Sequence, residues 1–566
     1  MPSSFSSLAP AAPAAPTASN ASNAHAASNA AAASNAAVDS PSTVRTAVLA
    51  LLRDLGMTTI FGNPGSTELP MFRDFPADFR YVLGLQEAVV VGMADGYAQA
   101  TRRPAIVNLH SAAGVGNAMG NIFTAFLNRT PLVITAGQQA RSILPFDPFL
   151  FSSQATELAK PYVKWSIEPA RAQDVPQALA RACYVAMQPP CGPVLVSIPA
   201  DDWEHPAEPV PVRQVGTGLR PDPAVLAQIG EALDASARPA IVVGAGVDRD
   251  GAWDDVRALA ERHQARVWVA PMSARGGFDE THALFAGFLP AIRERIVERL
   301  AGHDVVLVLG APAFSYHVEG QGPHLPEGAT LCQLIDDAHT AAWTPVGIAA
   351  QCSIGLGVRD LLARPAPVTP RAQPEARQQP ARAQPPAPGQ RMSVAFALQT
   401  LNEVRDPGCI VVEEAPGSRP VMQERLHFTR SHTFFTMASG GLGWGMPATV
   451  GMALGRPGER VIGLIGDGSS MYSIQALWSA AQLKLPITFL ILNNRRYAAL
   501  QDFAPVFGYA PGETPQGTAL PGLDFVALAR GQGLDALRVS DANALADVLR
   551  QSLQGTGPVL VEIDVD

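Results

Sequence analysis

The chain has 566 residues, of which 47% are hydrophobic and 16% charged, and its formal net charge is −9. This length predicts roughly three to four domains with sizeable cores. The sequence shows no basic run with interleaved aromatic residues, which disfavours nucleic-acid binding. It also shows no apolar run of the roughly 18 residues that span a bilayer. Its five cysteines form no CxxC pair, which favours free thiols and a cytoplasmic location.

The first 41 residues differ in composition from the rest of the chain. They repeat Ala, Ser, Asn and Pro, and no Lys or Arg precedes Arg45. Because the charged start of a signal peptide is missing, we expect residues 1–41 to be a disordered tail, or to follow from a start codon placed too early.

Beyond this tail, strand-like apolar runs alternate with helical patterns in three blocks. The blocks cover residues 42–205, 220–363 and 392–566, and a Pro/Ala-rich linker covers 364–391. Such alternation predicts three α/β domains with parallel sheets. In the first block we expect helices over 43–55, 87–100, 117–127 and 175–187, and strands over 58–61, 81–85, 105–109, 132–136 and 194–198.

The second block contains a short glycine motif. We expect strands over 240–243, 267–270, 305–309 and 331–335, and Gly244-Ala245-Gly246 follows the first of them. This motif invites a dinucleotide-binding interpretation, but the third glycine of that fingerprint is absent. We therefore favour a structural spacer domain.

Two polar residues of the third block each follow a strand-like run. Asp467 follows the apolar run 461–465, and Asn494 follows the run 487–492, with a helical pattern between them. Parallel connection brings both strand ends to one edge of the sheet, where ligands bind. A carboxylate and an amide oxygen suit Mg²⁺ that also holds phosphate oxygens. The block therefore predicts a metal clip for a phosphorylated cofactor.

Several motifs together resemble those of the thiamine-diphosphate-dependent 2-oxo-acid decarboxylases, and most closely the benzoylformate decarboxylases. The resemblance covers nearly all of the chain beyond the tail, and it implies a pyrimidine-binding first block and a diphosphate-binding third block. The motifs are Phe61-Gly62-Asn63-Pro64-Gly65-Ser66, Leu85-Gln86-Glu87-Ala88, Asn108-Leu109-His110-Ser111-Ala112-Ala113-Gly114, Gly440-Gly441-Leu442-Gly443 and the Asp467 and Asn494 pair.

The cofactor that the resemblance implies is thiamine diphosphate anchored by Mg²⁺, with Ca²⁺ able to take its place. The metal ligands would be Asp467, Asn494 and the backbone carbonyl of Arg496. By itself, Glu87 would only complement the dipole of the helix that it begins; in the family its counterpart binds the aminopyrimidine and promotes ylid formation. Leu442 matches the apolar wedge that bends the cofactor. The implied cofactor-binding set is Glu87, Gly440, Leu442, Gly466, Asp467, Gly468, Ser469, Asn494 and Tyr497.

The reaction that the resemblance implies is non-oxidative decarboxylation of an aromatic 2-oxo acid, benzoylformate to benzaldehyde and CO₂, through the ylid. Ser66 would orient the leaving carboxylate, and His110 and His282 would transfer protons in an order left open. Alone, Ser66 suits a turn cap and His282 a surface residue. The alternatives are another 2-oxo acid, a carboligase or aldehyde lyase, an inert relative, and an oxidoreductase resting on Gly244–Gly246.

The substrate pocket implied by the resemblance is mostly apolar. Thr436 departs from the family, which has an aromatic residue there, and predicts a larger pocket or one that admits a ring substituent. Pro416-Gly417 and Arg495-Arg496 also depart. Because the family's glutamate comes from the neighbouring subunit, we expect a homotetramer, a dimer of dimers with sites at the dimer interface. The implied pocket residues are Phe149, Leu150, Thr436, Ala499, Leu500 and Phe503.

Overall fold

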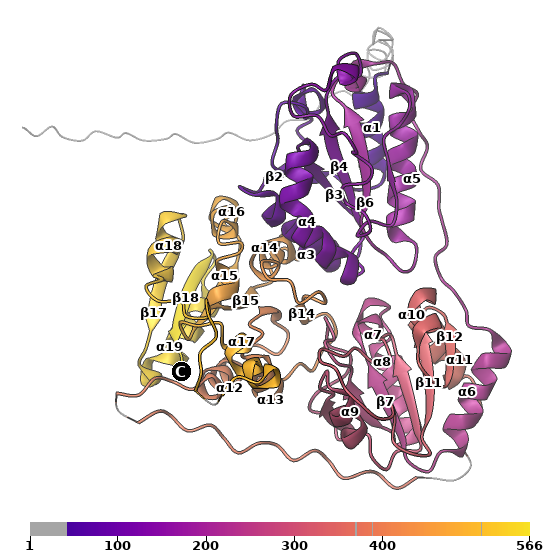
Figure 1. Ribbon diagram of the computed structural model, residues 1–566, viewed down its shortest axis with the longest axis vertical. Helices are drawn as coiled ribbons and strands as arrows, with labels where there is room; N and C mark the ends of the chain where they lie inside the picture. The colour runs from indigo at the N-terminus through magenta and orange to yellow at the C-terminus, as the bar shows by residue number, and fades with distance from the viewer. Residues whose placement is uncertain (1–41, 368–370, 388, 511) are drawn as a thin grey trace, which may run out of the picture. The chain divides into compact units, whose positions relative to one another are not determined.

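The computed structural model describes residues 42–367, 371–387, 389–510 and 512–566. The tail expected at residues 1–41 and linker positions 368–370 and 388 lie outside this part of the chain. Three sheets of six parallel strands each follow one another along the described chain, which confirms the predicted fold class (Figure 1). None of the helices in the described ranges is both long and apolar enough to traverse a lipid bilayer.

The first sheet has the strand order β2-β1-β3-β4-β6-β5. Helix α4 begins at Ser111, six residues before the expected start, so that His110 is its N-cap residue. The strands are β1 (Thr59–Gly62), β2 (Arg80–Leu83), β3 (Ala105–Leu109), β4 (Leu132–Gln138), β5 (Ser166–Ile167) and β6 (Val194–Pro199), and the helices are α1 (Val44–Asp54), α2 (Leu69–Phe72), α3 (Glu87–Thr101), α4 (Ser111–Leu127) and α5 (Val175–Met187).

The second sheet has the order β12-β11-β10-β7-β8-β9. A Cβ at Gly244 would lie 2.4 Å from Ala311 Cβ, and one at Gly246 would lie 2.7 Å from Gly310 Cα. Close packing therefore accounts for both glycines. The strands are β7 (Pro239–Val243), β8 (Arg266–Val269), β9 (Phe285–Phe288), β10 (Val305–Leu309), β11 (Thr330–Ile335) and β12 (Ile348–Gln351), and the helices are α6 (Pro223–Ala235), α7 (Ala245–Arg249), α8 (Trp253–His263), α9 (Arg293–Arg299), α10 (Ala338–Trp343) and α11 (Ile354–Leu362).

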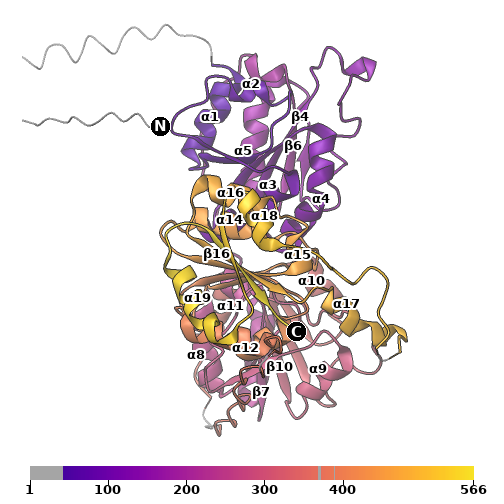
Figure 2. The same cartoon turned by 90° about the vertical axis from the view of Figure 1, so that its left-hand side faces the viewer.

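The third sheet has the order β14-β13-β15-β16-β18-β17. The strands are β13 (Ile410–Glu414), β14 (Phe434–Thr436), β15 (Val461–Gly466), β16 (Ile487–Asn493), β17 (Asp535–Val539) and β18 (Val559–Asp564), and the helices are α12 (Val394–Val404), α13 (Arg419–Arg425), α14 (Gly445–Gly455), α15 (Asp467–Ser470), α16 (Ala476–Leu483), α17 (Ala498–Phe503), α18 (Phe525–Gly531) and α19 (Ala542–Gln554). Helices α12 and α19 cover one face, and α14, α16 and α18 cover the other (Figure 2).

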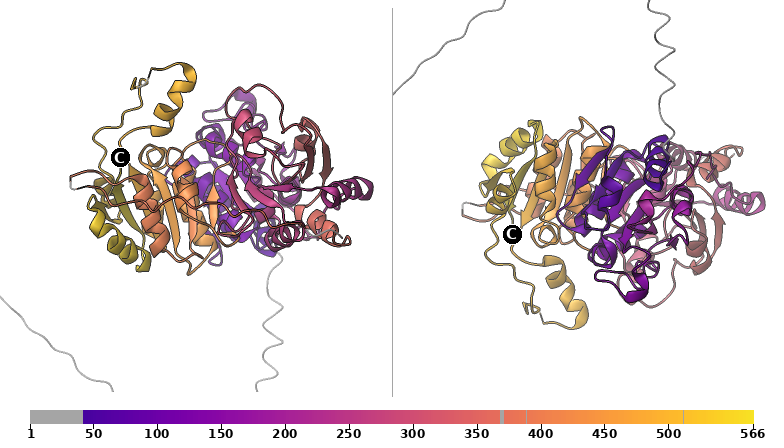
Figure 3. Two further views of the ribbon diagram at one scale, coloured as in Figure 1. Left: turned by 90° about the horizontal axis from the view of Figure 1, so that it is seen from below. Right: turned by 90° about the horizontal axis from the view of Figure 1, so that it is seen from above.

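Alternating apolar side chains explain why this sheet is covered on both faces. Val411, Ile462 and Leu490 pack toward α12 and α19. Val412 and Ile491, which directly follow two of these residues, belong to the core shared with α14. Strands buried on both faces are near-continuous apolar runs in the sequence. Figure 3 views the same strands from below and from above.

The first and third sheets are joined through helices α3 and α14, which meet at backbone distance. A Cβ added at Gly96 would lie 2.1 Å from the carbonyl oxygen of Ala448, and one at Gly451 would lie 1.8 Å from the carbonyl oxygen of Met93. Any side chain at either glycine would therefore force the helices apart.

A buried carboxylate reinforces this helix pair. Asp95 of α3 is fully buried, and it accepts hydrogen bonds from Gln99 Nε2 (2.7 Å), Asn128 Nδ2 (3.1 Å), Thr130 Oγ1 (2.7 Å) and Trp444 Nε1 (2.9 Å). Burial raises the pKa of Asp95 and these four donors lower it. The indole of Trp444 comes from the residue directly before α14, so the network spans both sheets.

Candidate active site

One cluster of predicted site residues lies at the carboxyl edge of the first sheet. Glu87 is the first residue of α3, and its two carboxylate oxygens accept hydrogen bonds from Asn63 Nδ2 (3.3 Å) and Asn117 Nδ2 (3.1 Å). Asn63 follows β1, and Asn117 lies on α4. The turn and the two helices therefore fix the direction of this carboxylate.

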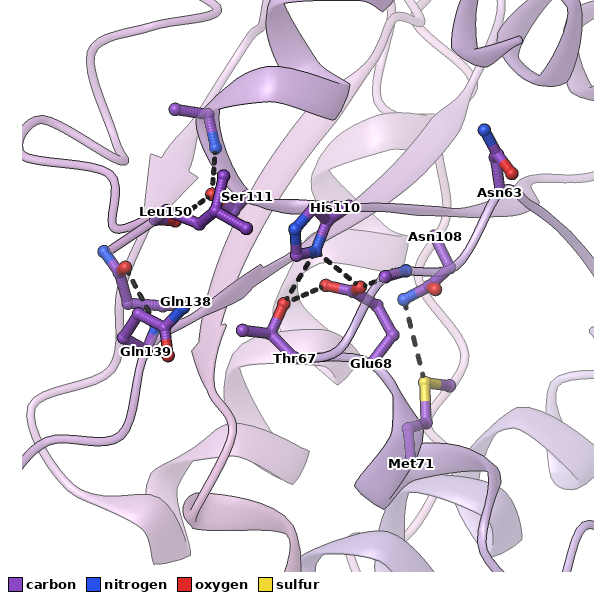
Figure 4. Close-up of polar contacts among 12 residues, drawn as sticks. Asn63, Thr67, Glu68, Met71, Asn108, His110, Ser111, Gln138, Gln139 and Leu150 are labelled. Carbon is purple, nitrogen blue, oxygen red and sulfur yellow. Dashed lines mark hydrogen bonds and ion pairs between the residues drawn. The ribbon is translucent and has the colours of Figure 1, made fainter. Parts of the chain in front are cut away.

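His110 is fixed by a second carboxylate that sequence reasoning missed. Glu68 Oε2 lies 2.9 Å from His110 Nδ1, and the Gly65 amide donates to the same oxygen at 2.7 Å (Figure 4). Thr67 Oγ1 donates to Glu68 Oε1 at 2.5 Å and lies 3.1 Å from His110 Nδ1. The Glu68 side chain is only 1% exposed, and it holds the His110 ring through Nδ1, which leaves Nε2 for other partners.

The other predicted residues of this cluster are exposed. Ser66 lies in the turn between β1 and α2. Phe149 is 86% exposed and Leu150 is 39% exposed, although both backbone carbonyls accept hydrogen bonds. Ser111 Oγ donates to Leu150 O at 2.5 Å (Figure 4), and Gln139 Nε2 donates to Phe149 O at 2.8 Å. The backbone of this segment is therefore held in place while its two large apolar side chains stay uncovered.

The second cluster lines a cavity of about 1140 Å³ between the second and third sheets. The cavity brings together every predicted metal and cofactor residue of the third block and half of the predicted substrate pocket. These residues are Gly440, Leu442, Gly466, Asp467, Gly468, Ser469, Asn494, Arg496 and Tyr497, with Ala499, Leu500 and Phe503 of the pocket. Glu87, Ser66, His110, Phe149 and Leu150 do not line it.

The Asp467 carboxylate retains capacity for a cation. Its Oδ1 accepts the Gly468 amide at 2.7 Å and its Oδ2 accepts the Arg495 amide at 2.6 Å, which leaves lone pairs on both oxygens. Burial raises the pKa of Asp467, so a bound cation would offset the cost of the buried charge. Among the described residues, the one donor to Asn494 Oδ1 is the Arg496 amide, at 3.2 Å. This donor set of hard oxygens fits a metal that bridges to phosphate.

The segment that carries Leu442 is held by the carboxylate of Glu414. Like Glu68, Glu414 was not predicted from the sequence. Glu414 ends β13 and accepts the amides of Gly443 (2.6 Å), Trp444 (2.8 Å) and Gly445 (2.5 Å). Gly440 has a φ of 71° and a Cβ there would meet no atom within 4 Å, so the backbone beside it is open to a ligand. The apolar run that precedes Glu414 was the sequence feature that could have placed this carboxylate at the end of a strand.

Two further predicted residues, His282 and Thr436, are absent from the cavity lining. His282 Nε2 pairs with Glu261 Oε1 at 3.2 Å, and His282 is absent from the lining. Thr436 is 1% exposed and its hydroxyl accepts a hydrogen bond from Arg419. Instead, the cavity is lined by His317, whose ring stacks on Phe503 at 4.7 Å. The sequence signal for His317 was its place in the segment after β10, at the carboxyl edge of the second sheet.

Comparisons with known proteins agree with this arrangement. Family models for thiamine pyrophosphate enzymes match residues 42–156 (N-terminal TPP binding domain), 226–361 (central domain) and 417–563 (C-terminal TPP binding domain). The chain belongs to the thiamine pyrophosphate enzyme family. Thiamine diphosphate is thus the phosphorylated cofactor that the Asp467 and Leu442 segments would hold.

Individual relatives of this thiamine pyrophosphate enzyme carry related names. The chain is 45% identical over 530 residues to the benzoylformate decarboxylase of Pseudomonas aeruginosa, covering 92% of this chain and 98% of that one. It resembles the structure of the Rhodococcus jostii 4-hydroxybenzoylformate decarboxylase (TM-score 0.88, 39% identity, 93% and 99% coverage). It also resembles that of the Polynucleobacter necessarius benzoylformate decarboxylase (TM-score 0.89, 39% identity, 92% and 98% coverage).

The role of Glu414 generates a prediction on pH and stability. Burial raises the pKa of Glu414 from 4.5 to about 7. Because the folded chain holds this proton more tightly than the unfolded chain, the stabilisation is full below pH about 4.5 and is lost as the pH rises through about 7. Urea unfolding of the wild type and of Glu414→Gln should show a free-energy advantage of the wild type that falls by roughly 2–3 kcal/mol between pH 5 and pH 8. An advantage that does not change with pH would contradict this account.

Proposed function

We propose that this thiamine pyrophosphate enzyme is a carboxy-lyase that converts benzoylformate to benzaldehyde and CO₂ without oxidation. The observation that carries the proposal is one cavity that joins the cofactor-holding oxygens of Asp467 and Asn494, the apolar wall of Leu500 and Phe503, and the His317 imidazole. The 45% identical benzoylformate decarboxylase supports the choice of substrate.

A divalent metal is part of this proposal. Asp467, Asn494 and the backbone carbonyl of Arg496 would hold Mg²⁺, or Ca²⁺ in its place, against the diphosphate. The Arg495 guanidinium does not compete with the metal, because it points to Asp564 with Nη2 at 3.1 Å from Oδ1. Gly468 would let the backbone approach the diphosphate, and its space is bounded by the Tyr497 ring.

Residues of the chain would orient the substrate and transfer protons. Bound thiamine diphosphate supplies the electron sink for the pair released when CO₂ departs. Glu87, oriented by two asparagines, would hold a proton at the aminopyrimidine. Ser66 would hydrogen-bond the carboxylate that leaves, and His110 Nε2 would donate a proton to the former keto oxygen. Covered by a second copy of the chain, the apolar wall would help to exclude water from these steps.

The second proton-transfer group would be His317 rather than His282. His317 lies in the cavity wall with its ring held against Phe503, whereas His282 is paired with Glu261 outside the lining. A proton-transfer group must come within hydrogen-bond reach of the reacting atoms. Position therefore favours His317.

A second copy of the chain would complete the site. Glu87, Ser66 and His110 lie on the first sheet and outside the cavity, while their predicted partners line it. Uncovered Phe149 and Leu150 fit the role of a surface that closes on a partner's cavity. We propose a homodimer with shared sites, assembled further into a tetramer, in the cytoplasm, where the five free cysteines stay reduced.

The substrate assignment predicts a rank order of 2-oxo acids. With thiamine diphosphate and Mg²⁺ supplied, kcat/KM for CO₂ release should be highest for aryl 2-oxo acids such as benzoylformate, and lower for pyruvate and branched-chain 2-oxo acids. The apolar wall gains contact area from a ring. A preference for pyruvate would overturn the aromatic assignment, and no turnover of any 2-oxo acid would overturn the decarboxylase.

Because the two histidines differ in position, we expect their alanine variants to differ in activity. His317→Ala should lower kcat on benzoylformate by about 10²–10⁴-fold, because a positioned acid is lost. His282→Ala should leave kcat within a factor of about two, with at most a small loss of stability. Equal losses from both substitutions would contradict the proposed roles, and circular dichroism would check that each variant folds.

The shared site predicts complementation between two inactive variants. Glu87→Gln damages one cluster and Asp467→Ala damages the other. If each site joins two chains, mixed dimers contain one intact site, and random pairing restores about a quarter of the wild-type activity. Co-expression with two different affinity tags isolates the mixed species. Activity that stays at the level of the separate variants would show that each chain builds its own site.

A further inference from the structure

Several charged side chains line the cavity, although sequence analysis expected its substrate pocket to be mostly apolar, and Arg419 is one of them. Arg419 is the first residue of α13 and lines the cavity, with its side chain 12% exposed. A guanidinium is costly to bury unless it is paired and hydrogen-bonded. Its partners therefore indicate what this part of the wall can bind.

One side of the guanidinium is fully engaged. Glu413, which is completely buried in β13, places Oε2 at 2.9 Å from Arg419 Nε and 2.7 Å from Nη2. Nη2 also donates to Thr436 Oγ1 at 2.6 Å and lies 3.7 Å from Met437 Sδ. Glu413 Oε1 in turn accepts the Ala415 amide at 2.5 Å. The guanidinium is thus held rigidly and its charge is balanced.

The other side of the guanidinium is available to the cavity. Within the described residues Nη1 of Arg419 has no hydrogen-bond partner, and it is not among the fully buried polar atoms. An arginine carries two N–H donors on this nitrogen. Because Arg419 lines the cavity, these unpaired donors are available to a ligand bound there.

The contact with Arg419 gives the Thr436 side chain a structural role. Sequence analysis expected its small side chain to enlarge the pocket or to admit a ring substituent. In the structure Thr436 is buried, and its hydroxyl instead holds Arg419, which does line the cavity. The departure from an aromatic residue at this position therefore acts through the guanidinium.

We propose that Arg419 Nη1 donates hydrogen bonds to a neutral oxygen, a hydroxyl or an ether, on the aryl ring of the substrate. This inference rests on the proposed function and narrows its substrate class to ring-oxygenated aryl 2-oxo acids. The oxygen is neutral because Glu413 already balances the guanidinium, and a ring carboxylate would add an uncompensated charge. An unsubstituted ring displaces water from Nη1 and leaves its donors unpaired.

The test compares ring substituents in the wild-type holoenzyme. For 3-hydroxy-, 4-hydroxy- and 4-methoxybenzoylformate, at least one compound should exceed benzoylformate in kcat/KM by about ten- to a hundredfold, while 4-carboxybenzoylformate should fall below benzoylformate. Preference for benzoylformate over every oxygenated ring, or for the carboxylated ring, would overturn the proposal.

A matched pair of variants assigns any preference to this residue. Arg419→Lys keeps the charge opposite Glu413 but lacks Nη1, so it should lose most of the preference for the oxygenated ring. Arg425→Lys changes the last residue of the same helix, where the arginine donates to the Ala381 carbonyl at 2.6 Å outside the cavity lining, and should keep the preference. Retention of the preference in Arg419→Lys would overturn the role of Nη1.

A binding measurement separates this proposal from the proposed reaction. Calorimetric titration of the holoenzyme with mandelate and with the ring-hydroxylated mandelates requires no turnover. Tighter binding of a hydroxylated compound to the wild type, lost in Arg419→Lys, would support the ring-oxygen site even if no 2-oxo acid were decarboxylated. Equal binding of all compounds would overturn it whether or not the enzyme is active.

Discussion

The arrangement of the site depends on the close contact of α3 with α14. Gly96 and Gly451 let the two backbones meet, and Asp95 draws donors from both sides of the contact. Each helix begins at one cluster of the site: α3 at Glu87, and α14 directly after the segment that carries Leu442. Asn121 Nδ2 links the two ends by donating to Ala88 O (2.6 Å) and Gly443 O (3.2 Å). The helix pair therefore sets where the two clusters lie.

Buried carboxylates hold the site's loops by accepting backbone amides. Glu68 holds the turn after β1, Glu413 holds the start of the segment before α13, Glu414 holds the segment before α14, and Asp467 holds the segment after β16. One carboxyl group can accept several backbone amides at once. These loops are thus fixed by hydrogen bonds to buried carboxyl groups rather than by apolar packing.

The sequence predicted the fold well because parallel strands covered on both faces are apolar runs. The runs before Asp467 and Asn494 became β15 and β16, and both residues line one cavity as expected. Short edge strands such as β5 and β9 were not predicted, since two to four residues carry little periodicity. The sequence analysis expected α4 to begin six residues too late, because the glycines and alanines after Ser111 give no amphipathic pattern.

The site was harder to predict where a role depends on tertiary neighbours. Glu68 and Glu414 have no motif of their own, and only the folded chain shows which amides they accept. His282 has sequence neighbours that resemble the family, yet its side chain turns to Glu261, while His317 reaches the cavity from a segment without a recognisable pattern. Thr436 was singled out as a departure, but its partner Arg419 lies 17 positions away.

The contact at Gly96 and Gly451 also fixes a distance within the chain. Because its spacing is set by backbone atoms, no change of rotamer can lengthen or shorten it. The separation between the Glu87 end and the Leu442 end of one chain is therefore a fixed length. In an assembly where each end meets the opposite end of a second copy, that length sets how far apart the two shared sites lie.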